Sequence, residues 1–101
     1  MTMLADTRFS NRRRALAAQL AALRIDTVLV THLKHVRYLS NFSGSNGAVL
    51  LNKDLSATIA TDGRYLTQIE EEVPDLEKVI ATKAVDLELL SRITGPRRVA
   101  F

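Results

Sequence analysis

The chain has no cysteine and no tryptophan, and its 101 residues include only two prolines and four glycines. Without cysteine there is no disulfide framework and no thiolate chemistry, which favours a cytoplasmic location over a secreted one. No apolar run approaches the roughly 20 residues of a membrane-spanning helix, and nothing at the start of the chain resembles a secretory signal. We therefore expect no membrane as a partner.

The chain also has no large excess of one sign of charge, because it contains 14 basic and 11 acidic residues, for a net charge of +3. Basic residues adjoin only at positions 12–14 and 97–98. A nucleic-acid surface needs a broader basic stripe, usually with aromatic side chains between the charges, and the few aromatics here do not interleave with these arginines. We interpret residues 12–14 as a solvated helix face and expect no nucleic acid as a partner.

Apolar residues (47%) and charged residues (25%) occur in the proportions of a globular protein, and the length fits one domain. After a frayed start at residues 1–8, apolar periodicity and turn residues predict nine elements. Helices are expected at 11–23, 33–40, 62–72 and 85–93, and strands at 26–30, 48–51, 57–61, 77–81 and 97–101. This order predicts a three-layer α/β fold with a mixed five-stranded sheet and one antiparallel hairpin.

Particular residues are expected to set the limits of these elements. Ser10 and Asp62 are plausible N-caps of the first and third helices, because their side-chain oxygens can accept a first-turn amide. Pro74 should end the third helix. The inner face of that helix is expected to comprise Tyr65, Leu66, Ile69 and Val73. Because natural domains rarely end within an apolar strand, we expect the natural protein to continue beyond the last residue.

The only two histidines, His32 and His35, lie three residues apart near the start of a predicted helix. Such a pair can share a helix face, but an ion needs further carboxylate or imidazole ligands. Asp26 and Asp54 are the nearest acidic residues in sequence, and neither belongs to a recognisable ligand set. We interpret the histidines as polar loop side chains and expect no metal site in this chain.

Residues 43–47, SGSNG, form a loop of small and polar residues. A serine nucleophile needs a base and an orienting acid, and this loop leads into a strand, unlike a hydrolase elbow or a phosphate loop. We therefore expect no catalytic residue here. Gly44 and Gly47 are expected to permit positive φ and the close approach of another surface. Phe42, just before them, is either a plug between helix and sheet or a partly exposed contact.

The segment 61–65, TDGRY, also has two readings. In the structural one Asp62 caps a helix, Arg64 pairs with a local carboxylate and Tyr65 packs inward. In the functional one Arg64 or Tyr65 contacts a substrate or another subunit, since a guanidinium binds both oxygens of a carboxylate.

Residues 36–47, VRYLSNFSGSNG, together with the TDGRY segment, resemble the amino-terminal domain of the creatinase, prolidase and Xaa-Pro aminopeptidase family. The resemblance runs from about Arg12 to Phe101, so residues 1–101 are assigned to one such domain. One departure is Asn41, where the family commonly has glycine. That residue is tolerated if the position is not left-handed, or if asparagine adopts the left-handed conformation itself.

The resemblance implies a ribonuclease H-like fold and a parent enzyme that hydrolyses bonds next to proline. The family's two divalent ions, Mn, Co or Zn, are bound in a later catalytic domain whose ligand motifs are absent from this sequence, so the chain alone is expected to be inactive. In relatives this domain contributes to oligomerisation and to the substrate cleft. The motifs are more similar to the Xaa-Pro aminopeptidase and dipeptidase branch, although creatinase shares the fold and cleaves a different bond without metal.

Expected partners are therefore the catalytic domain, further copies of the chain and a proline-containing peptide. The alternatives are a stand-alone binding or dimerisation module and the N-terminal domain of a creatinase-like amidinohydrolase. Residues 32–35 and 42–46 lack periodic apolar positions and carry polar groups, and loops on a rigid sheet are favoured places for binding. The candidate cleft or interface residues are His32, His35, Phe42, Ser45, Asn46 and Arg64.

Overall fold

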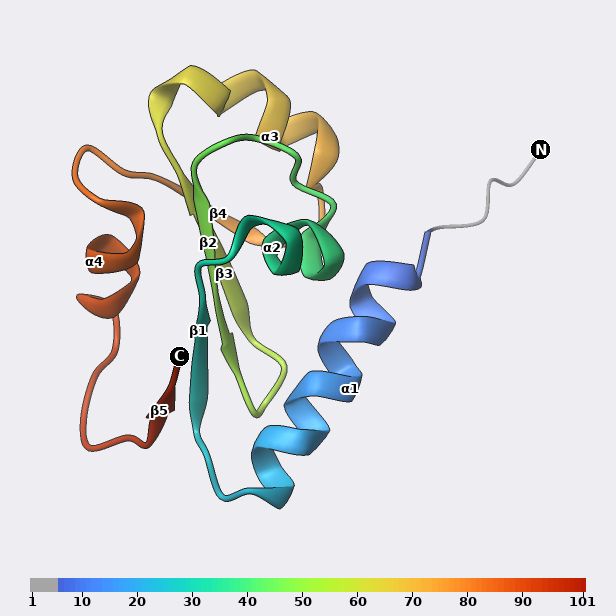
Figure 1. Ribbon diagram of the computed structural model, residues 1–101, viewed down its shortest axis with the longest axis vertical. Helices are drawn as coiled ribbons and strands as arrows, with labels where there is room; N and C mark the ends of the chain where they lie inside the picture. The colour runs from blue at the N-terminus through green and yellow to red at the C-terminus, as the bar shows by residue number, and fades with distance from the viewer. Residues whose placement is uncertain (1–5) are drawn as a thin grey trace.

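A mixed five-stranded sheet forms the centre of the computed structural model, which describes residues 6–101 (Figure 1). Its strands lie in the order β4-β3-β2-β1-β5. The strands are β1 (Thr27–Val30), β2 (Gly47–Asn52), β3 (Ala57–Thr61), β4 (Glu77–Ile80) and β5 (Val99–Ala100). β2 and β3 form the predicted hairpin, while β3–β4 and β1–β5 are parallel pairs.

A second antiparallel pairing, between β1 and β2, was not expected from the sequence, which predicted only the hairpin. The connection between these strands contains α2 (Leu33–Ser40) and a loop. It stays at the end of the sheet where β1 finishes (Figure 1). The chain therefore enters β2 from that same end, whereas a parallel partner would require a crossover back to the start of β1.

Helices cover both faces of the sheet, as predicted (Figure 1). α4 (Val85–Leu90) packs on one face, and α1 (Arg8–Ala22) and α2 pack on the other. The 3₁₀ turn η1 (Gly63–Tyr65) leads directly into α3 (Leu66–Glu72). Within residues 6–101, none of the helices is both long and apolar enough to cross a bilayer.

Strand side chains alternate between two hydrophobic clusters, one on each face. Leu50 of β2 joins the α4 side, and Val49 joins the side of α2 and α3. The α4 cluster comprises Leu29, Ala48, Leu50, Ala60, Val79, Ala81, Val85 and Leu89. The opposite cluster comprises Val36, Phe42, Val49, Ile59, Ile69 and Val73.

The first helix begins earlier than predicted. Thr7 is its N-cap residue, and Ser10 lies inside the first turn, where its hydroxyl donates to the Thr7 carbonyl at 3.1 Å. Asp6 accepts the Arg8 amide at 3.0 Å, which brings Arg8 into the helix although residues 1–8 were expected to fray. Residues 1–5 of that predicted segment lie outside the described residues.

The interpretation of residues 12–14 as a solvated face is wrong for Arg13, which is 6% exposed. Its guanidinium donates to the Leu39 carbonyl at 2.8 Å and to the Asp75 carboxylate at 2.5 Å. The prediction that Leu66 faces inward is also wrong, since it is 53% exposed. The preceding 3₁₀ turn has about 3.0 residues per turn, against 3.6 in an α-helix, which changes the phase of the following residues.

Candidate functional site

The two segments that carry the sequence resemblance meet at one end of the sheet. β1 and β3 run in the same direction and end there, and β2 begins there (Figure 1). The loop at residues 41–46 and the capped turn at residues 62–65 are therefore neighbours. Crevices outside the carboxyl ends of strands are the usual ligand sites of open α/β sheets.

Hydrogen bonds join the loop directly to the turn. The Asn46 side-chain amide donates to the Asp62 carboxylate at 2.8 Å, and the Thr61 hydroxyl donates to the Asn46 carbonyl at 2.5 Å. The hydroxyls of Ser45 and Tyr65 lie 2.5 Å apart. Of the predicted candidates, Ser45 and Asn46 are thus brought beside the segment that contains Arg64.

Asp62 caps the turn, as predicted from the sequence, and holds Arg64 in place. Its carboxylate accepts the Arg64 backbone amide at 3.0 Å and two guanidinium N–H groups at 2.9 Å each. The Arg64 guanidinium, and then the Asn46 amide, hold the pKa of Asp62 well below its usual range. The Arg64 side chain remains 68% exposed, so it is an oriented cation at the surface.

Of the two alternatives for Phe42, the plug between helix and sheet is correct, because the residue is only 1% exposed. Its ring meets the Tyr65 ring edge-on, with centroids 5.6 Å apart and planes at 86°. A Cβ on Gly44 would lie 2.3 Å from the Phe42 ring, and one on Gly47 would lie 3.0 Å from it. The small residues therefore admit a close approach, as expected, and the approaching surface is the chain's own phenylalanine.

Positive φ, however, was predicted at the wrong residues of this loop. Neither Gly44 nor Gly47 has it. The left-handed residue is Asn41, with φ 75°, at the C-cap of α2. Asparagine thus adopts the conformation itself at the position where the family commonly has glycine, and its side chain donates to the Glu72 carbonyl at 3.3 Å.

Glu72 fixes the loop from the other side and was not identified from the sequence. Its carboxylate accepts the Ser43 amide at 2.9 Å, the Ser43 hydroxyl at 2.7 Å and the Gln68 amide at 3.2 Å. Burial raises the pKa of Glu72, but the bonds from Ser43 and Gln68 outweigh it, so the pKa is lowered overall. A sequence feature that could have indicated this role is the i,i+4 spacing of Gln68 and Glu72, which places both residues on one helix face.

A hollow of about 290 Å³ lies beside this loop, and Ser45 and Asn46 contribute to its lining. Thr31 and Leu33 line it from the segment after β1, and Asp86 lines it from α4. Of the predicted loop at residues 32–35, only Leu33 lines this hollow.

His32 and His35 lie elsewhere, in a larger groove of about 750 Å³ between α1 and β1. Both side chains are exposed, and their ring centroids are 4.7 Å apart. The Nδ1 atom of His32 accepts the Lys34 amide at 3.3 Å, which makes this histidine the N-cap of α2. The structure therefore does not bring the histidines together with Ser45, Asn46 and Arg64 around one hollow.

Chemically, the arrangement offers oriented hydrogen-bonding groups. The Ser43 hydroxyl is bonded to Glu72, and the Ser45 hydroxyl is bonded to Tyr65. Across residues 6–101, no three His, Cys, Asp or Glu side chains gather closely enough to hold a metal ion.

Comparison with solved structures identifies several close relatives. The chain is 64% identical to the N-terminal domain of a protein described as a metallopeptidase from Corynebacterium diphtheriae, with a TM-score of 0.87 over 92% of this chain and 74% of that one. It is 51% identical to the N-terminal domain of the cytoplasmic peptidase PepQ from Mycobacterium tuberculosis H37Rv, with a TM-score of 0.69 over 71% of this chain and 56% of that one. No curated protein matches the chain.

Another solved structure matches this chain over only a small part of its own length. The Xaa-Pro dipeptidase from Bacillus anthracis is 26% identical, with a TM-score of 0.69, and the match spans 82% of this chain but only 23% of that one. Residues 12–101 match the family described as the Creatinase/Prolidase N-terminal domain. The chain therefore belongs to the creatinase/prolidase N-terminal domain family.

Proposed function

We propose that this chain is the non-catalytic N-terminal domain of a proline-specific metallopeptidase, an Xaa-Pro aminopeptidase or dipeptidase. The observation that carries the proposal is the match of residues 12–101 to the family, with 51% identity to the corresponding domain of a cytoplasmic peptidase. The metal chemistry belongs to a separate catalytic domain with two divalent ions, Mn, Co or Zn. A cytoplasmic location and a homo-oligomeric parent are parts of the same proposal.

The sheet end that carries Ser45, Asn46 and Arg64 is the surface we assign to the substrate cleft. Bonds to Asp62 and Tyr65 hold these polar groups in fixed positions, so little conformational entropy is lost when they contact a ligand. Two N–H groups of the Arg64 guanidinium already donate to Asp62, and its remaining exposed N–H groups can donate to a carboxylate of a peptide substrate.

The test uses the full-length parent protein with Mn²⁺ or Co²⁺ and a proline-containing peptide. We expect Arg64→Gln to raise KM several-fold with little change in kcat, because it removes a binding group and no reacting group. Arg92→Gln, which removes an exposed arginine paired with Glu77, is the matched control and should leave both constants unchanged.

The isolated 101-residue chain should show no turnover under the same conditions. Turnover by this chain would contradict the assignment of a non-catalytic domain. Identical kinetics for Arg64→Gln and the control would contradict the assignment of the cleft. Hydrolysis of creatine in place of the peptide by the parent would favour the creatinase branch.

A further inference from the structure

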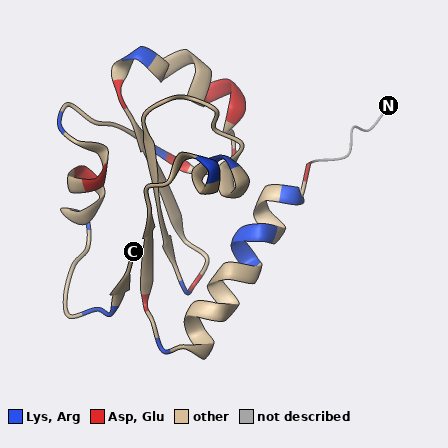
Figure 2. Cartoon of the chain, viewed as in Figure 1, with Lys and Arg blue, Asp and Glu red and all other residues tan. Residues whose placement is uncertain are grey.

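A basic pocket of about 430 Å³ lies between α1 and α2, and Asn41, at the start of the loop described above, also lines it. The basic segments of the two helices lie next to each other (Figure 2). Its lining combines four cations with two aromatic rings: Arg8, Phe9, Arg12, Lys34, Arg37 and Tyr38. Arg8 and Arg12 are spaced i,i+4 on α1, and Lys34 and Arg37 are spaced i,i+3 on α2, so each pair shares a helix face.

Three of these cations have no acidic partner of their own. Within the described range 6–101, no carboxylate lies within ion-pair distance of Arg12, Lys34 or Arg37. Arg37 influences the Glu72 carboxylate at longer range, but that carboxylate is bonded to Ser43. Asp6 pairs with Arg8 and acts on Arg12 at longer range, so the remaining positive charge of the pocket comes mainly from Arg12, Lys34 and Arg37. A hollow with an excess of one sign of charge attracts the opposite charge.

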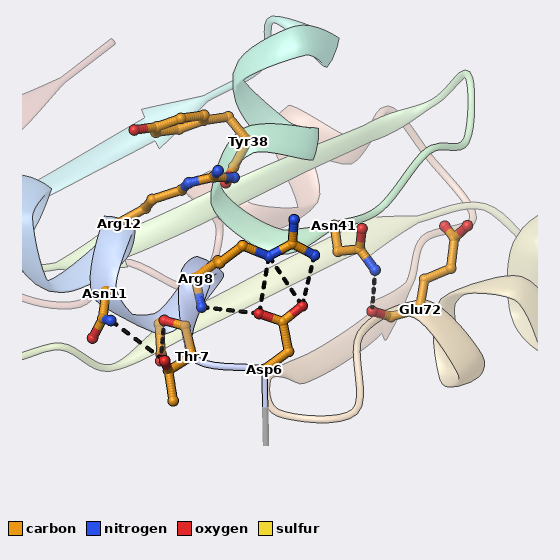
Figure 3. Close-up of polar contacts among 9 residues, drawn as sticks. Asp6, Thr7, Arg8, Asn11, Arg12, Tyr38, Asn41 and Glu72 are labelled. Carbon is orange, nitrogen blue, oxygen red and sulfur yellow. Dashed lines mark hydrogen bonds and ion pairs between the residues drawn. The ribbon is translucent and has the colours of Figure 1, made fainter. Parts of the chain in front are cut away.

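The Arg12 guanidinium is held in one orientation by neighbouring groups of the chain. It lies over the Tyr38 ring, with the guanidinium carbon 4.2 Å from the ring centroid (Figure 3). The same carbon lies 5.2 Å from the centroid of the Phe9 ring. The Nη1 atom of Arg12 donates to the Tyr38 carbonyl at 3.0 Å. A guanidinium fixed by stacking and by a hydrogen bond loses less rotamer freedom on binding an anion.

A contact next to the pocket indicates a type of anion that suits these cations. Asp6 places its carboxylate against Arg8, with two bonds of 2.8 and 3.1 Å in a bidentate arrangement (Figure 3). The Arg8 guanidinium and backbone amide lower the pKa of Asp6 to about 2. A carboxylate on a peptide backbone thus already binds one cation of the group.

We propose that this pocket binds a carboxylate-rich peptide segment of a partner, with Arg12, Lys34 and Arg37 as the binding cations. Single-stranded nucleic acid is less suited, because it requires open aromatic faces on which bases can stack. Here a guanidinium lies over both rings, Arg8 and Arg12 over Phe9 and Arg12 over Tyr38. The inference does not depend on peptidase activity in the parent.

The test titrates the 101-residue chain with an N-acetylated, C-amidated hexaglutamate, followed by NMR. The backbone amides of Arg12, Lys34, Arg37 and Tyr38, and the side-chain N–H groups of the three cations, should show the largest shifts. The double variant Lys34→Gln/Arg37→Gln should weaken binding roughly tenfold, since two charge-assisted contacts are lost. The control variant Arg24→Gln/Lys83→Gln removes the same charge from exposed positions outside the pocket and should change affinity less than roughly twofold.

Hexaglutamine serves as the neutral peptide and should not bind. Equal weakening in the two double variants would overturn the proposal, because it would mean attraction to net charge alone. Absence of hexaglutamate binding at low salt would overturn it as well. Binding of inorganic pyrophosphate or of a single-stranded oligonucleotide at the same residues, without binding of hexaglutamate, would replace the peptide by a phosphate ligand.

Discussion

Asn46 and Asp62 are 16 residues apart in the sequence and are joined by a hydrogen bond of 2.8 Å between the asparagine amide and the carboxylate. The bond links the two segments that carry the family resemblance. Their co-occurrence in the sequence thus has a structural basis, because each segment supplies half of one contact at the end of the sheet.

Because Asp62 is charged, the stability of variants at Asn46 should depend on the charge of the new side chain. We expect Asn46→Asp to lower the melting temperature at about pH 7 more than Asn46→Ala, since it places two carboxylates opposite each other. The difference should shrink at about pH 4, because the introduced carboxyl protonates there while Asp62, with its lowered pKa, stays charged. Equal melting temperatures for the two variants at both pH values would mean that the bond does not form in solution.

The fit between Phe42 and Gly44 should be sensitive to a single methyl group. Gly44→Ala places a Cβ at 2.3 Å from the ring and should cost about 1–3 kcal/mol by overpacking. Gly63→Ala is the matched control, because nothing lies within 4 Å of its Cβ and it should change stability by less than about 1 kcal/mol. Urea unfolding of both variants measures the contrast.

A double-mutant cycle checks that the clash is with Phe42. Adding Phe42→Leu to Gly44→Ala shortens the side chain that the new methyl group meets, so the two changes together should cost less than their sum. Strict additivity would place the effect of Gly44→Ala elsewhere in the loop.

Removal of Phe42 itself should affect folding before it affects any ligand. Phe42→Ala deletes a buried ring and should cost about 3–5 kcal/mol in unfolding free energy. That is a large share of the roughly 5–15 kcal/mol typical of a domain. Chemical denaturation measures the loss, and a cost below about 1 kcal/mol would contradict the plug.

Arg13 should be the one stability-critical arginine of the basic run at residues 12–14. Asp75→Ala leaves this buried guanidinium with only the Leu39 carbonyl as a partner, which should lower the unfolding free energy by about 1–3 kcal/mol. The cost stays in this range because the Asp75 side chain is 47% exposed, so the lost ion pair is partly solvated. Arg14→Gln changes an exposed residue on the same helix and should stay within about 0.5 kcal/mol. Similar melting temperatures for the two variants would argue against the ion pair.

Glu72 should contribute a measurable part of the acid sensitivity of the domain. Its pKa is lower in the folded chain than the ordinary value of 4.5, so its contribution is fully present above that value and declines as the pH falls through the folded pKa. Unfolding free energy should therefore fall below about pH 4.5 in the original chain.

Glu72→Gln keeps the shape of the side chain and removes this titration. Its stability should be lower at neutral pH and should fall less steeply on acidification, although Asp62 still titrates at lower pH. Parallel pH curves for the two proteins would show that the bonds from Ser43 do not favour the ionised carboxylate.

The sequence by itself determined the order of helices and strands, the hairpin and the cap at Asp62, because these depend on periodicity and on residues close in the chain. It also indicated the family, through two short segments of unusual composition. It did not predict the pairing of β1 with β2, because that depends on how the α2 connection packs on the sheet.

Only the tertiary structure decided the contacts between distant residues. Burial of Arg13 requires Leu39 and Asp75, which lie 26 and 62 residues further along the chain. The hydrogen bonds that Ser43 donates to Glu72 span 29 residues, and local propensity contains no information about them. Likewise, His32 and Ser45 are both polar loop residues in the sequence, and only the packing of α1 against α2 and β1 places them around different hollows.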